Sequence, residues 1–293
     1  MTTYTITREV LPEQIVPGKR LGRHIWHDSR SRDYAVDESP AGALASMTWE
    51  RHIPILDQGN VGSCTGNAMC GALGTSPIYD ALPSGHSHLG EAEALRIYSE
   101  AEDIDGDGPY PPNDYGSYGL SVAKAAKNDG LIPGYLHAFS LSGLQTALQT
   151  GPVIVGVNWY TSMDSPDSRG LITVGGSVRG GHELAARQLD MAGGVIWLDN
   201  SWGPGWGLAG RCCIRFADFS RLMSEGGDVT VPLPLSEPPP QPVPWQHPDI
   251  QFGHDQRVID WAAAAASGAL NVPVNEAYAA QQYQAWRKAR GYA

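Results

Sequence analysis

The chain has 293 residues, of which 42% are hydrophobic and 17% are charged. This hydrophobic content excludes a wholly disordered protein, because disorder requires low hydrophobicity together with a high net charge. The formal net charge is −11, and no cluster of Lys or Arg interrupts it. An acidic surface repels the phosphates of nucleic acids, so we expect no nucleic-acid partner.

The sequence also argues against a membrane protein. Its longest apolar stretches lie near residues 153–160 and 261–270, whereas a spanning helix needs about 20 residues. The N-terminus lacks the apolar region of a secretory signal. The four cysteines, two of which are neighbours, do not form the pattern of a disulfide framework. We therefore expect a reduced, cytoplasmic protein and no membrane partner.

The first part of the chain predicts an arm followed by helices. Residues 1–47 are irregular with scattered charges, and we interpret them as an N-terminal arm that lies on the main body or is partly mobile. Small residues after it predict a tightly packed helix, and amphipathic patterns predict three more. The predicted helices cover 64–73, 91–102, 120–128 and 142–150, the last with Ser142 as its N-cap.

The periodicity changes after Gly151-Pro152. Short runs of apolar and β-branched residues between glycine-rich turns now predict strands. These cover 153–160, 184–189, 194–199 and 211–216. Helices followed by strands predict an α+β fold with two lobes.

The C-terminal part has a different composition. Eight prolines fall between Pro232 and Pro248, which favours extended polyproline geometry and predicts a linker or strap over 232–248. Residues 249–293 predict a tail with two Ala-rich helices, over 256–270 and 275–290. This helix pair is too small to form its own core, so we expect the tail to dock on its own domain or on a partner protein.

Cys64 directly follows a turn that contains two glycines, at the start of a predicted helix. The positive end of the helix dipole lowers the pKa of a thiol there and favours the thiolate. Gln58 can place its side-chain amide beside the sulfur, so this amide and the backbone N–H of Cys64 are candidate oxyanion donors. Taken alone, a buried cysteine is more often a small hydrophobic residue.

Two further segments complement Cys64. His182 follows two glycines and precedes small apolar residues, which predicts a ring that projects into a cleft from the start of a strand. Asn200 precedes two tryptophans in a glycine-rich loop. An Asn fixes an imidazole with one hydrogen bond, and an indole over that bond strengthens it by excluding water.

Together these segments resemble the papain family of cysteine peptidases. The matching motifs are Gly-Ser-Cys at 62–64 with Gln58 ahead of it, Gly-His at 181–182, and Asn-Ser-Trp-Gly-Pro-Gly-Trp-Gly at 200–207. The order Cys, His, Asn is that of the family, and the His and Asn follow Cys64 by 118 and 136 residues. The spacing expected in the family is about 130–150 residues. The resemblance covers roughly residues 48–220.

The resemblance implies a cysteine endopeptidase that acts on polypeptides and needs no cofactor. Cys64 would be the nucleophile, a thiolate beside the His182 imidazolium, which later protonates the leaving amine. Asn200 would fix the ring, and Gln58 with the Cys64 N–H would stabilise the oxyanion. The implied architecture is a helical lobe over 48–150 and a β-barrel-like lobe over 151–231, which together form the peptidase domain 48–231.

Further residues are implied to shield the site or to bind substrate. Trp202 and Trp206 would shield the His–Asn bond. The implied substrate-binding residues are Gly116, Ser117, Gly181 and Glu183. Glu183 lies where relatives carry a small residue beside the pocket for the second residue N-terminal to the cut, which predicts a preference for a basic side chain there. Alternatively, Glu183 pairs with Arg187 or turns to solvent.

The chain also departs from the family. Val61 stands where a cysteine often lies and Thr65 where an aromatic residue is usual, so the usual disulfides lack partners. These features resemble bacterial or bacteriophage members. No propeptide of the usual length precedes residue 48, so either the enzyme is made active or the arm or tail restrains it.

An acidic run partly matches a calcium-binding loop. Its candidate ligands are Asp103, Asp105, Asp107 and Asp114. Prolines stiffen the second half of this run, so the alternative is an acidic turn that borders the substrate cleft.

Two other functions remain open at this point. The first is a structural or interaction protein on a papain scaffold, within a larger assembly such as a phage particle. The second is a thiol acyltransferase. A protein that only binds has no physical reason to keep Cys64, His182, Asn200 and Gln58 together, which favours the enzyme.

Overall fold

A computed structural model describes residues 5–38, 43–83, 88–236 and 263. The described parts of Ile6–His27 and Val36–Pro240 form one compact unit, whereas Asp28–Ala35, which includes the short helix η1, belongs to another. The predicted C-terminal tail lies outside the described residues except for Ala263, as does the Pro-rich segment beyond Ser236. No helix within the described residues is both long and apolar enough to cross a membrane.

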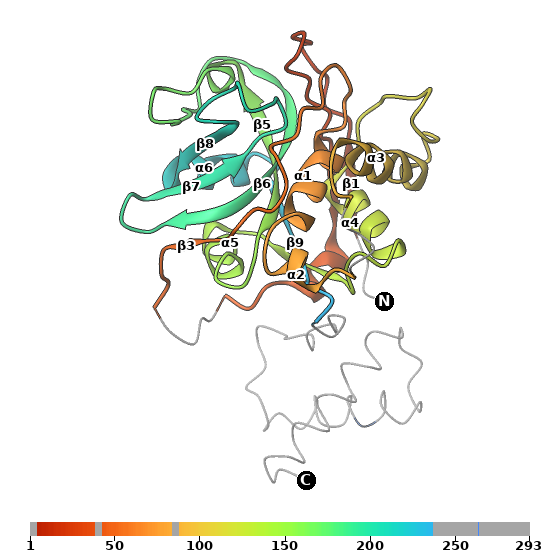
Figure 1. Ribbon diagram of the computed structural model, residues 1–293, viewed down its shortest axis with the longest axis horizontal. Helices are drawn as coiled ribbons and strands as arrows, with labels where there is room; N and C mark the ends of the chain where they lie inside the picture. The colour runs from red at the N-terminus through yellow and green to blue at the C-terminus, as the bar shows by residue number, and fades with distance from the viewer. Residues whose placement is uncertain (1–4, 39–42, 84–87, 237–262, 264–293) are drawn as a thin grey trace. The chain divides into compact units, whose positions relative to one another are not determined.

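In Figure 1, α1, α3 and α4 lie together on one side of the large sheet, with α1 next to the strands, whereas α5 and α6 lie among the strands away from them. The α-helices are α1 (Cys64–Leu73), α2 (Ile78–Ala81), α3 (Glu91–Asp105), α4 (Gly119–Asn128), α5 (Leu141–Ala147) and α6 (Phe216–Ser224). Short 3-10 helices cover η1 (Ser29–Tyr34) and η3 (Thr161–Asp164). The helices predicted over 64–73, 91–102, 120–128 and 142–150 are thus confirmed, with small shifts at their ends.

The strands form a two-stranded and a seven-stranded sheet. The small sheet pairs β1 (Ile6–Glu9) with β2 (Ile25–Asp28). The large sheet has the order β4-β9-β5-β6-β7-β8, with β3 (Met47–Thr48) paired to β6, and all its pairs are antiparallel. Its other strands are β4 (Tyr135–Ala138), β5 (Val153–Tyr160), β6 (Val178–Asp190), β7 (Val195–Asp199), β8 (Arg211–Arg215) and β9 (Asp228–Pro232). The α+β class predicted from the sequence is confirmed.

Strand β5 lies between β9 and β6 and faces two different environments. Val153, Val155 and Trp159 point into a hydrophobic cluster formed mainly by the strands. Ile154, with the opposite side-chain direction, belongs to a second cluster formed mainly by α1, α3 and α4. Because alternate residues of a strand point to opposite faces, a strand buried on both sides reads as a continuous apolar run.

Helix α1 is buried along its whole length, which explains its small residues. A Cβ built on Gly66 would lie 2.3 Å from the carbonyl oxygen of Ala94 in α3, and one on Gly71 would lie 2.9 Å from Nη1 of Arg51. Such distances leave no room for a larger side chain. The helix that begins with Cys64 is therefore fixed between α3 and the segment that contains Arg51.

Several predicted details are wrong for identifiable reasons. The N-cap of α5 is Ser140, whose side chain accepts the N–H of Gly143, and not Ser142. The strand predicted over 211–216 ends at Arg215, because Phe216 begins α6. The sequence analysis did not predict β4 and β9, which pair with each other across about ninety residues of chain. His182 lies inside β6 and not at its start.

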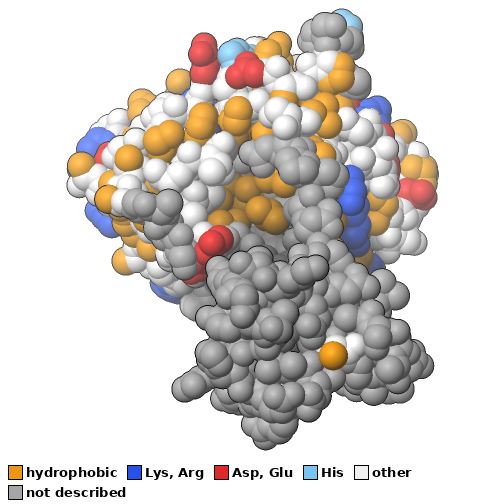
Figure 2. Space-filling view, turned by 90° about the horizontal axis from the view of Figure 1, so that it is seen from below, with side chains coloured by type: hydrophobic (Ala, Val, Ile, Leu, Met, Phe, Trp, Pro, Cys, Tyr) orange, Lys and Arg blue, Asp and Glu red, His pale blue; other side chains and the backbone are white. Residues whose placement is uncertain are grey.

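Figure 2 shows one face of the molecule, on which the Lys and Arg side chains form small separate groups. Hydrophobic and uncharged groups make up most of the described surface on this face.

The carboxylate of Asp199 is the centre of a buried ion cluster. Oδ2 accepts from Nη1 of Arg51 at 3.1 Å and from Nε of Arg187 at 2.8 Å, and Oδ1 accepts from Nε of Arg211 at 2.9 Å. The Asp199 side chain is 1% exposed. Arg51 also donates to the carbonyl oxygen of Ile53, and Arg187 donates to that of Trp49. One carboxylate thus joins β7 to β6, to β8 and to the segment after β3.

We predict that Asp199→Asn destabilises the fold by about 3 kcal/mol or more, because three nearby arginines lose their shared counter-charge in a buried site. Urea unfolding near pH 7 measures this change. Asp80→Asn is the control, since this side chain is 60% exposed and should change stability by less than about 0.5 kcal/mol. Equal effects of the two substitutions would contradict the role assigned to the cluster.

Candidate active site

Cys64 is the first residue of α1 and is fully buried. The backbone of Glu183, the residue after His182, hydrogen-bonds to the Cys64 sulfur. The preceding residue, Ser63, donates its hydroxyl to Oδ1 of Asn67 at 2.9 Å and so does not cap the helix. The thiol therefore lies at a helix N-terminus and against the strand that carries His182.

The ring of His182 is held from one side. Its Nε2 lies 2.7 Å from Oδ1 of Asn200, and the same oxygen accepts the N–H of Ser201 at 2.8 Å. An oxygen that only accepts requires Nε2 to carry the proton, which leaves Nδ1 with a lone pair. Nδ1 is buried without a hydrogen-bond partner among the described residues. This nitrogen is consequently the one able to exchange a proton with a thiol.

Two tryptophans enclose the imidazole. Trp202 stacks on His182 with ring centroids 4.9 Å apart, and Trp159 meets the ring edge-on at 4.9 Å. Trp206 packs on Trp202 and Trp159 but makes no ring contact with His182. Sequence reasoning missed Trp159, although strand alternation places it on the same face as Val157, the strand partner of His182.

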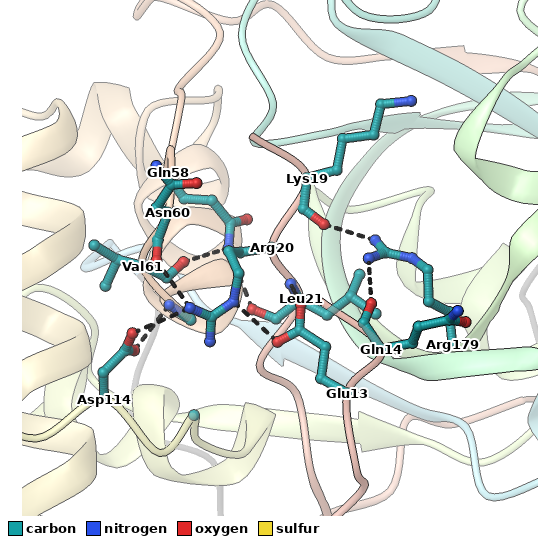
Figure 3. A network of polar contacts seen from close by, with 12 residues as sticks. Glu13, Gln14, Lys19, Arg20, Leu21, Gln58, Asn60, Val61, Asp114 and Arg179 are labelled. Atoms are coloured by element: carbon teal, nitrogen blue, oxygen red, sulfur yellow. Dashed lines mark hydrogen bonds and ion pairs between the residues drawn. The ribbon is translucent and has the colours of Figure 1, made fainter. Parts of the chain in front are cut away.

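Gln58 is oriented by hydrogen bonds at both ends of its amide. Oε1 accepts the hydroxyl of Ser201 at 2.6 Å, which leaves Nε2 as the donor end of the amide. Nε2 donates to the carbonyl oxygen of Val61 at 2.8 Å and to that of Leu21 at 3.3 Å. Figure 3 shows this amide between the loop before Cys64 and the N-terminal arm.

The sequence comparisons are negative. No protein-family model matches the chain, and no curated protein matches it by sequence. Similarity is found among solved structures instead. Xylellain, a cysteine protease from Xylella fastidiosa, superposes with a TM-score of 0.61 at 20% identity, covering 77% of this chain and 99% of its own. The chain has the papain-like fold.

A second solved structure agrees with this assignment. Procathepsin B S9 from Trypanosoma congolense superposes with a TM-score of 0.52 at 14% identity and covers 73% of this chain and 87% of its own. The fold predicted from three short motifs is thereby confirmed. The roles of individual residues stay predictions at this level of identity.

The N-terminal arm occupies the predicted substrate-binding residues of the papain-like fold. The N–H of Ser117 donates to Gly22 at 2.8 Å, and the carbonyl of Ser117 accepts from His24 at 2.8 Å. The carbonyl of Gly181 accepts from Gly22 at 3.2 Å and from Arg23 at 3.1 Å. Residues 22–24 thus lie between the two predicted substrate-binding segments and are hydrogen-bonded to both, with Arg23 in an isolated parallel bridge to Ser117.

Gly116 takes part in the same contact through its missing side chain. Its φ is +84°, and a Cβ there would lie 2.3 Å from the carbonyl oxygen of Gly22. A glycine at this position allows the extended chain to approach the backbone closely. The four predicted substrate-binding residues, Gly116, Ser117, Gly181 and Glu183, therefore all lie next to residues 22–23 of the arm.

Residues that the sequence analysis did not single out shape the arm and hold it in place (Figure 3). Within the arm, Glu13 accepts the backbone N–H of Leu21 at 2.9 Å and Nε of Arg20 at 3.1 Å. Arg179 of β6 holds the arm, because it donates to the backbone carbonyls of Gln14 at 3.0 Å and of Lys19 at 2.7 Å. The irregular sequence of the arm has no periodic pattern from which these contacts could be predicted.

Burial changes the expected charge state of the predicted catalytic pair, Cys64 and His182. It raises the pKa of the Cys64 thiol, against a lowering contribution from the backbone of Glu183. Burial also lowers the pKa of His182 to about 3, although the hydrogen bond to Asn200 opposes the shift. While the arm is seated, the neutral thiol and neutral imidazole are favoured. The thiolate–imidazolium pair stays a prediction for an open cleft.

The calcium loop predicted over Asp103, Asp105, Asp107 and Asp114 does not form. Within the described ranges, no three His, Cys, Asp or Glu side chains are grouped so as to hold a metal ion. Asp105 accepts the hydroxyls of Ser117 at 2.7 Å and of Ser121 at 2.5 Å. Asp114 accepts the N–H of Gly62 and the hydroxyl of Tyr98. Protein donors satisfy these carboxylates and direct them apart.

We predict a pH-dependent effect of Asp105→Asn. Burial raises the pKa of Asp105 to about 6, although the two serine hydroxyls lower it. A raised pKa in the folded state stabilises the fold below the unfolded pKa, and this contribution is lost as the pH rises through 6. From pH 4 to pH 8, the stability of the Asn variant should therefore improve relative to the parent by about 1–2 kcal/mol.

Urea unfolding of the two proteins at both pH values measures this change. The hydrogen bonds lost in the variant cancel, because only the pH dependence of the difference is compared. A difference that stays constant across this range would contradict the raised pKa.

Proposed function

We propose that this chain is a cysteine peptidase that uses Cys64, His182 and Asn200. The observation that supports it most is the His182–Asn200 hydrogen bond under Trp202, with Cys64 at the adjacent helix N-terminus. Nδ1 of His182 takes the thiol proton, and the sulfur attacks the peptide carbonyl to form a tetrahedral intermediate. The intermediate expels the amine, which receives the proton from His182, and a thioester on Cys64 remains.

Water completes the cycle. His182 removes a proton from a water molecule, the hydroxide adds to the thioester, and the acid product leaves while the thiol is restored. Asn200 keeps the ring in the same tautomer through both steps. The two tryptophans reduce the access of bulk water to the hydrogen bond that sets this tautomer.

The oxyanion is assigned to Gln58 and the backbone N–H of Cys64. Ser201 directs Nε2 of Gln58 into the cleft, where it already donates to a peptide carbonyl, that of Leu21. A preorganised donor of this kind contributes to catalysis because it needs no reorientation when charge develops. We place the scissile carbonyl of a substrate where the Leu21 carbonyl now lies.

The intact chain is then a latent form. The carbonyl of Leu21 faces Gln58, and residues 22–24 use the hydrogen bonds of Ser117 and Gly181. A polypeptide substrate must displace the arm before it reaches Cys64. The sequence analysis left open whether the arm or the tail restrains the enzyme, and we assign this role to the arm.

We predict that Gly22→Ala unseats the arm. A Cβ at Gly22 would lie 2.0 Å from the carbonyl oxygen of Gly62, and its φ of +133° disfavours any side chain. Gly18→Ala is the matched control, because Gly18 also has a positive φ but has nothing within 4 Å of a Cβ. Labelling of Cys64 by a peptidyl epoxide, mapped by mass spectrometry, should be at least about tenfold faster in Gly22→Ala than in Gly18→Ala.

Addition of His182→Ala to the Gly22→Ala chain should abolish this labelling, because no base then removes the thiol proton. Equal rates for the two glycine variants would contradict the latent form. Labelling that survives His182→Ala would contradict the proposed base.

We predict that Gln58→Ala in the Gly22→Ala chain lowers kcat by about 10²–10³, because one oxyanion donor is lost. KM should change much less, since the donor acts mainly on the developing charge. Hydrolysis of a fluorogenic peptide measures both constants. Gln149→Ala, whose amide bonds to the backbone of Ala45 away from the cleft, is the control, and a kcat loss no larger than the loss in this variant would sink the assignment.

A further inference from the structure

Arg179 is a buried cation that the proposed mechanism does not use. Its side chain is 1% exposed, and its guanidinium lies between Gln14 and Lys19 of the arm (Figure 3). Nη1 donates to the carbonyl of Gln14, and Nη2 donates to that of Lys19. Both outer nitrogens of the guanidinium are thus bound by backbone carbonyls that leave when the arm is displaced.

The positive charge of Arg179 is compensated incompletely by its surroundings. Burial lowers the pKa of the guanidinium, and the carboxylates of Asp164 and of Glu13 in the arm oppose this shift. Asp164 Oδ1 lies 3.2 Å from Nε of Arg179 and also accepts Nε1 of Trp159 at 2.7 Å. Because a buried cation is costly without counter-charge and acceptors, departure of the arm leaves Arg179 short of both.

Three successive carbonyls of the arm are bound by three residues of the main body. Arg179 donates to the carbonyl of Lys19 at 2.7 Å, Trp202 to that of Arg20 at 2.8 Å, and Gln58 to that of Leu21 at 3.3 Å. We assigned the place of the Leu21 carbonyl to the scissile carbonyl of a substrate. Arg179 therefore binds two residues along the chain from that place, a span of at most about 7 Å.

A hollow of about 470 Å³ beside this row gives room for a substrate. Its lining includes residues 18 and 19 of the arm and Asp164 and Trp202 of the main body. Since Lys19 and Asp164 both contact Arg179, displacement of the arm joins this hollow to the guanidinium.

The surroundings of Glu183 indicate which side of the cut Arg179 serves. Glu183 is implied to border the pocket for the second residue N-terminal to the cut, and Arg23 of the arm acts on it electrostatically. Residues 22–24 of the arm then occupy the part of the cleft for the N-terminal side of a substrate. Residues 19 and 20 lie beyond Leu21 in the opposite direction, so the part of the cleft at Arg179 takes residues C-terminal to the cut.

We propose that Arg179 binds a carboxylate of the substrate at about the second residue C-terminal to the cut. The inference rests on the proposed peptidase function. A carboxylate presents two oxygens to the two outer nitrogens of a guanidinium, and this charged bidentate pair is stronger than two bonds to neutral carbonyls. An Asp or Glu side chain supplies the group within a chain. The terminal carboxylate supplies it where the substrate ends at that residue, and the enzyme then releases a dipeptide.

The first test measures kcat/KM with the Gly22→Ala chain, by chromatography with mass detection of the products. One pair of amide-capped peptides differs only in Glu or Gln at the second residue C-terminal to the cut. A second pair ends at that residue, which is Gln, as a free acid or as an amide. The carboxylate peptide should be preferred at least about tenfold in one pair or in both. The fraction of molecules with an open cleft cancels in each ratio.

Substitution of Arg179 in the same chain shows whether it causes the preference. Arg179→Gln should bring the ratio to about one, and the pair in which the preference is lost identifies the source of the carboxylate. Arg179→Lys keeps the charge without the fork, so it should lower the ratio by only about threefold, and it replaces the Gln variant if that does not fold. Arg169→Gln is the matched control, because this arginine is 76% exposed, and it should leave the ratio unchanged.

The second test does not depend on hydrolysis. Fluorescent forms of the four peptides are titrated with the Gly22→Ala, Cys64→Ala chain, and fluorescence anisotropy gives each Kd. In the pair that shows the preference, the carboxylate peptide should bind at least about fivefold more tightly. Arg179→Gln should remove this difference.

The two tests separate the carboxylate site from the peptidase. A difference in Kd that depends on Arg179, without cleavage of any peptide, would support the site and reject the peptidase. Cleavage with ratios near one in both pairs, or with a preference that Arg179→Gln leaves unchanged, would overturn the site and keep the peptidase. Equal affinities without cleavage would reject both.

Discussion

The active-site geometry depends on one buried carboxylate. Asp199 immediately precedes Asn200, and its three arginine partners come from different parts of the chain. Arg187 is on the strand of His182, while Arg51 lies in the segment before Gln58 and packs against α1, the helix that begins with Cys64. Because such a carboxylate is stable only with its partners in place, it fixes the elements that carry Cys64, His182 and Asn200 relative to one another.

Sequence reasoning succeeded where packing is local: β5 was predicted from a run of apolar residues, which the structure buries on both faces. Cys64, His182 and Asn200 were singled out as candidates because each lies in a short segment of unusual composition, and their catalytic roles stay predictions. The pairing of β4 with β9, the contacts of Arg179 with the arm, and the position of Asp228 opposite Gly156 were not predictable. They depend on chain segments that meet only in the folded protein, and their residues are unremarkable in sequence.

The acidic run at Asp103–Asp114 and the surroundings of Glu183 both show a limit of sequence reasoning: the sequence does not give the partners of a charged side chain. Acidic residues at suitable spacing predicted a metal, but Ser117, Ser121 and Tyr98 hydrogen-bond to Asp105 and Asp114 from other elements. Glu183 was predicted to favour a basic side chain, and an arginine lies beside it, yet that arginine comes from the arm. Spacing indicates which groups are able to act together, whereas the partners that satisfy them follow from the tertiary structure.

The attachment of the arm to the same chain as the cleft has a quantitative consequence. Under the proposed function, residues 20–24 behave as a tethered competitor whose effective concentration does not change with dilution. The apparent affinity for substrate is then the intrinsic affinity multiplied by the fraction of molecules with an open cleft. Leu21 belongs to the same buried cluster as Trp159 and Trp202, so opening exposes apolar surface and keeps that fraction small. The activity of such a protein is governed by a folding equilibrium of a few residues at its N-terminus.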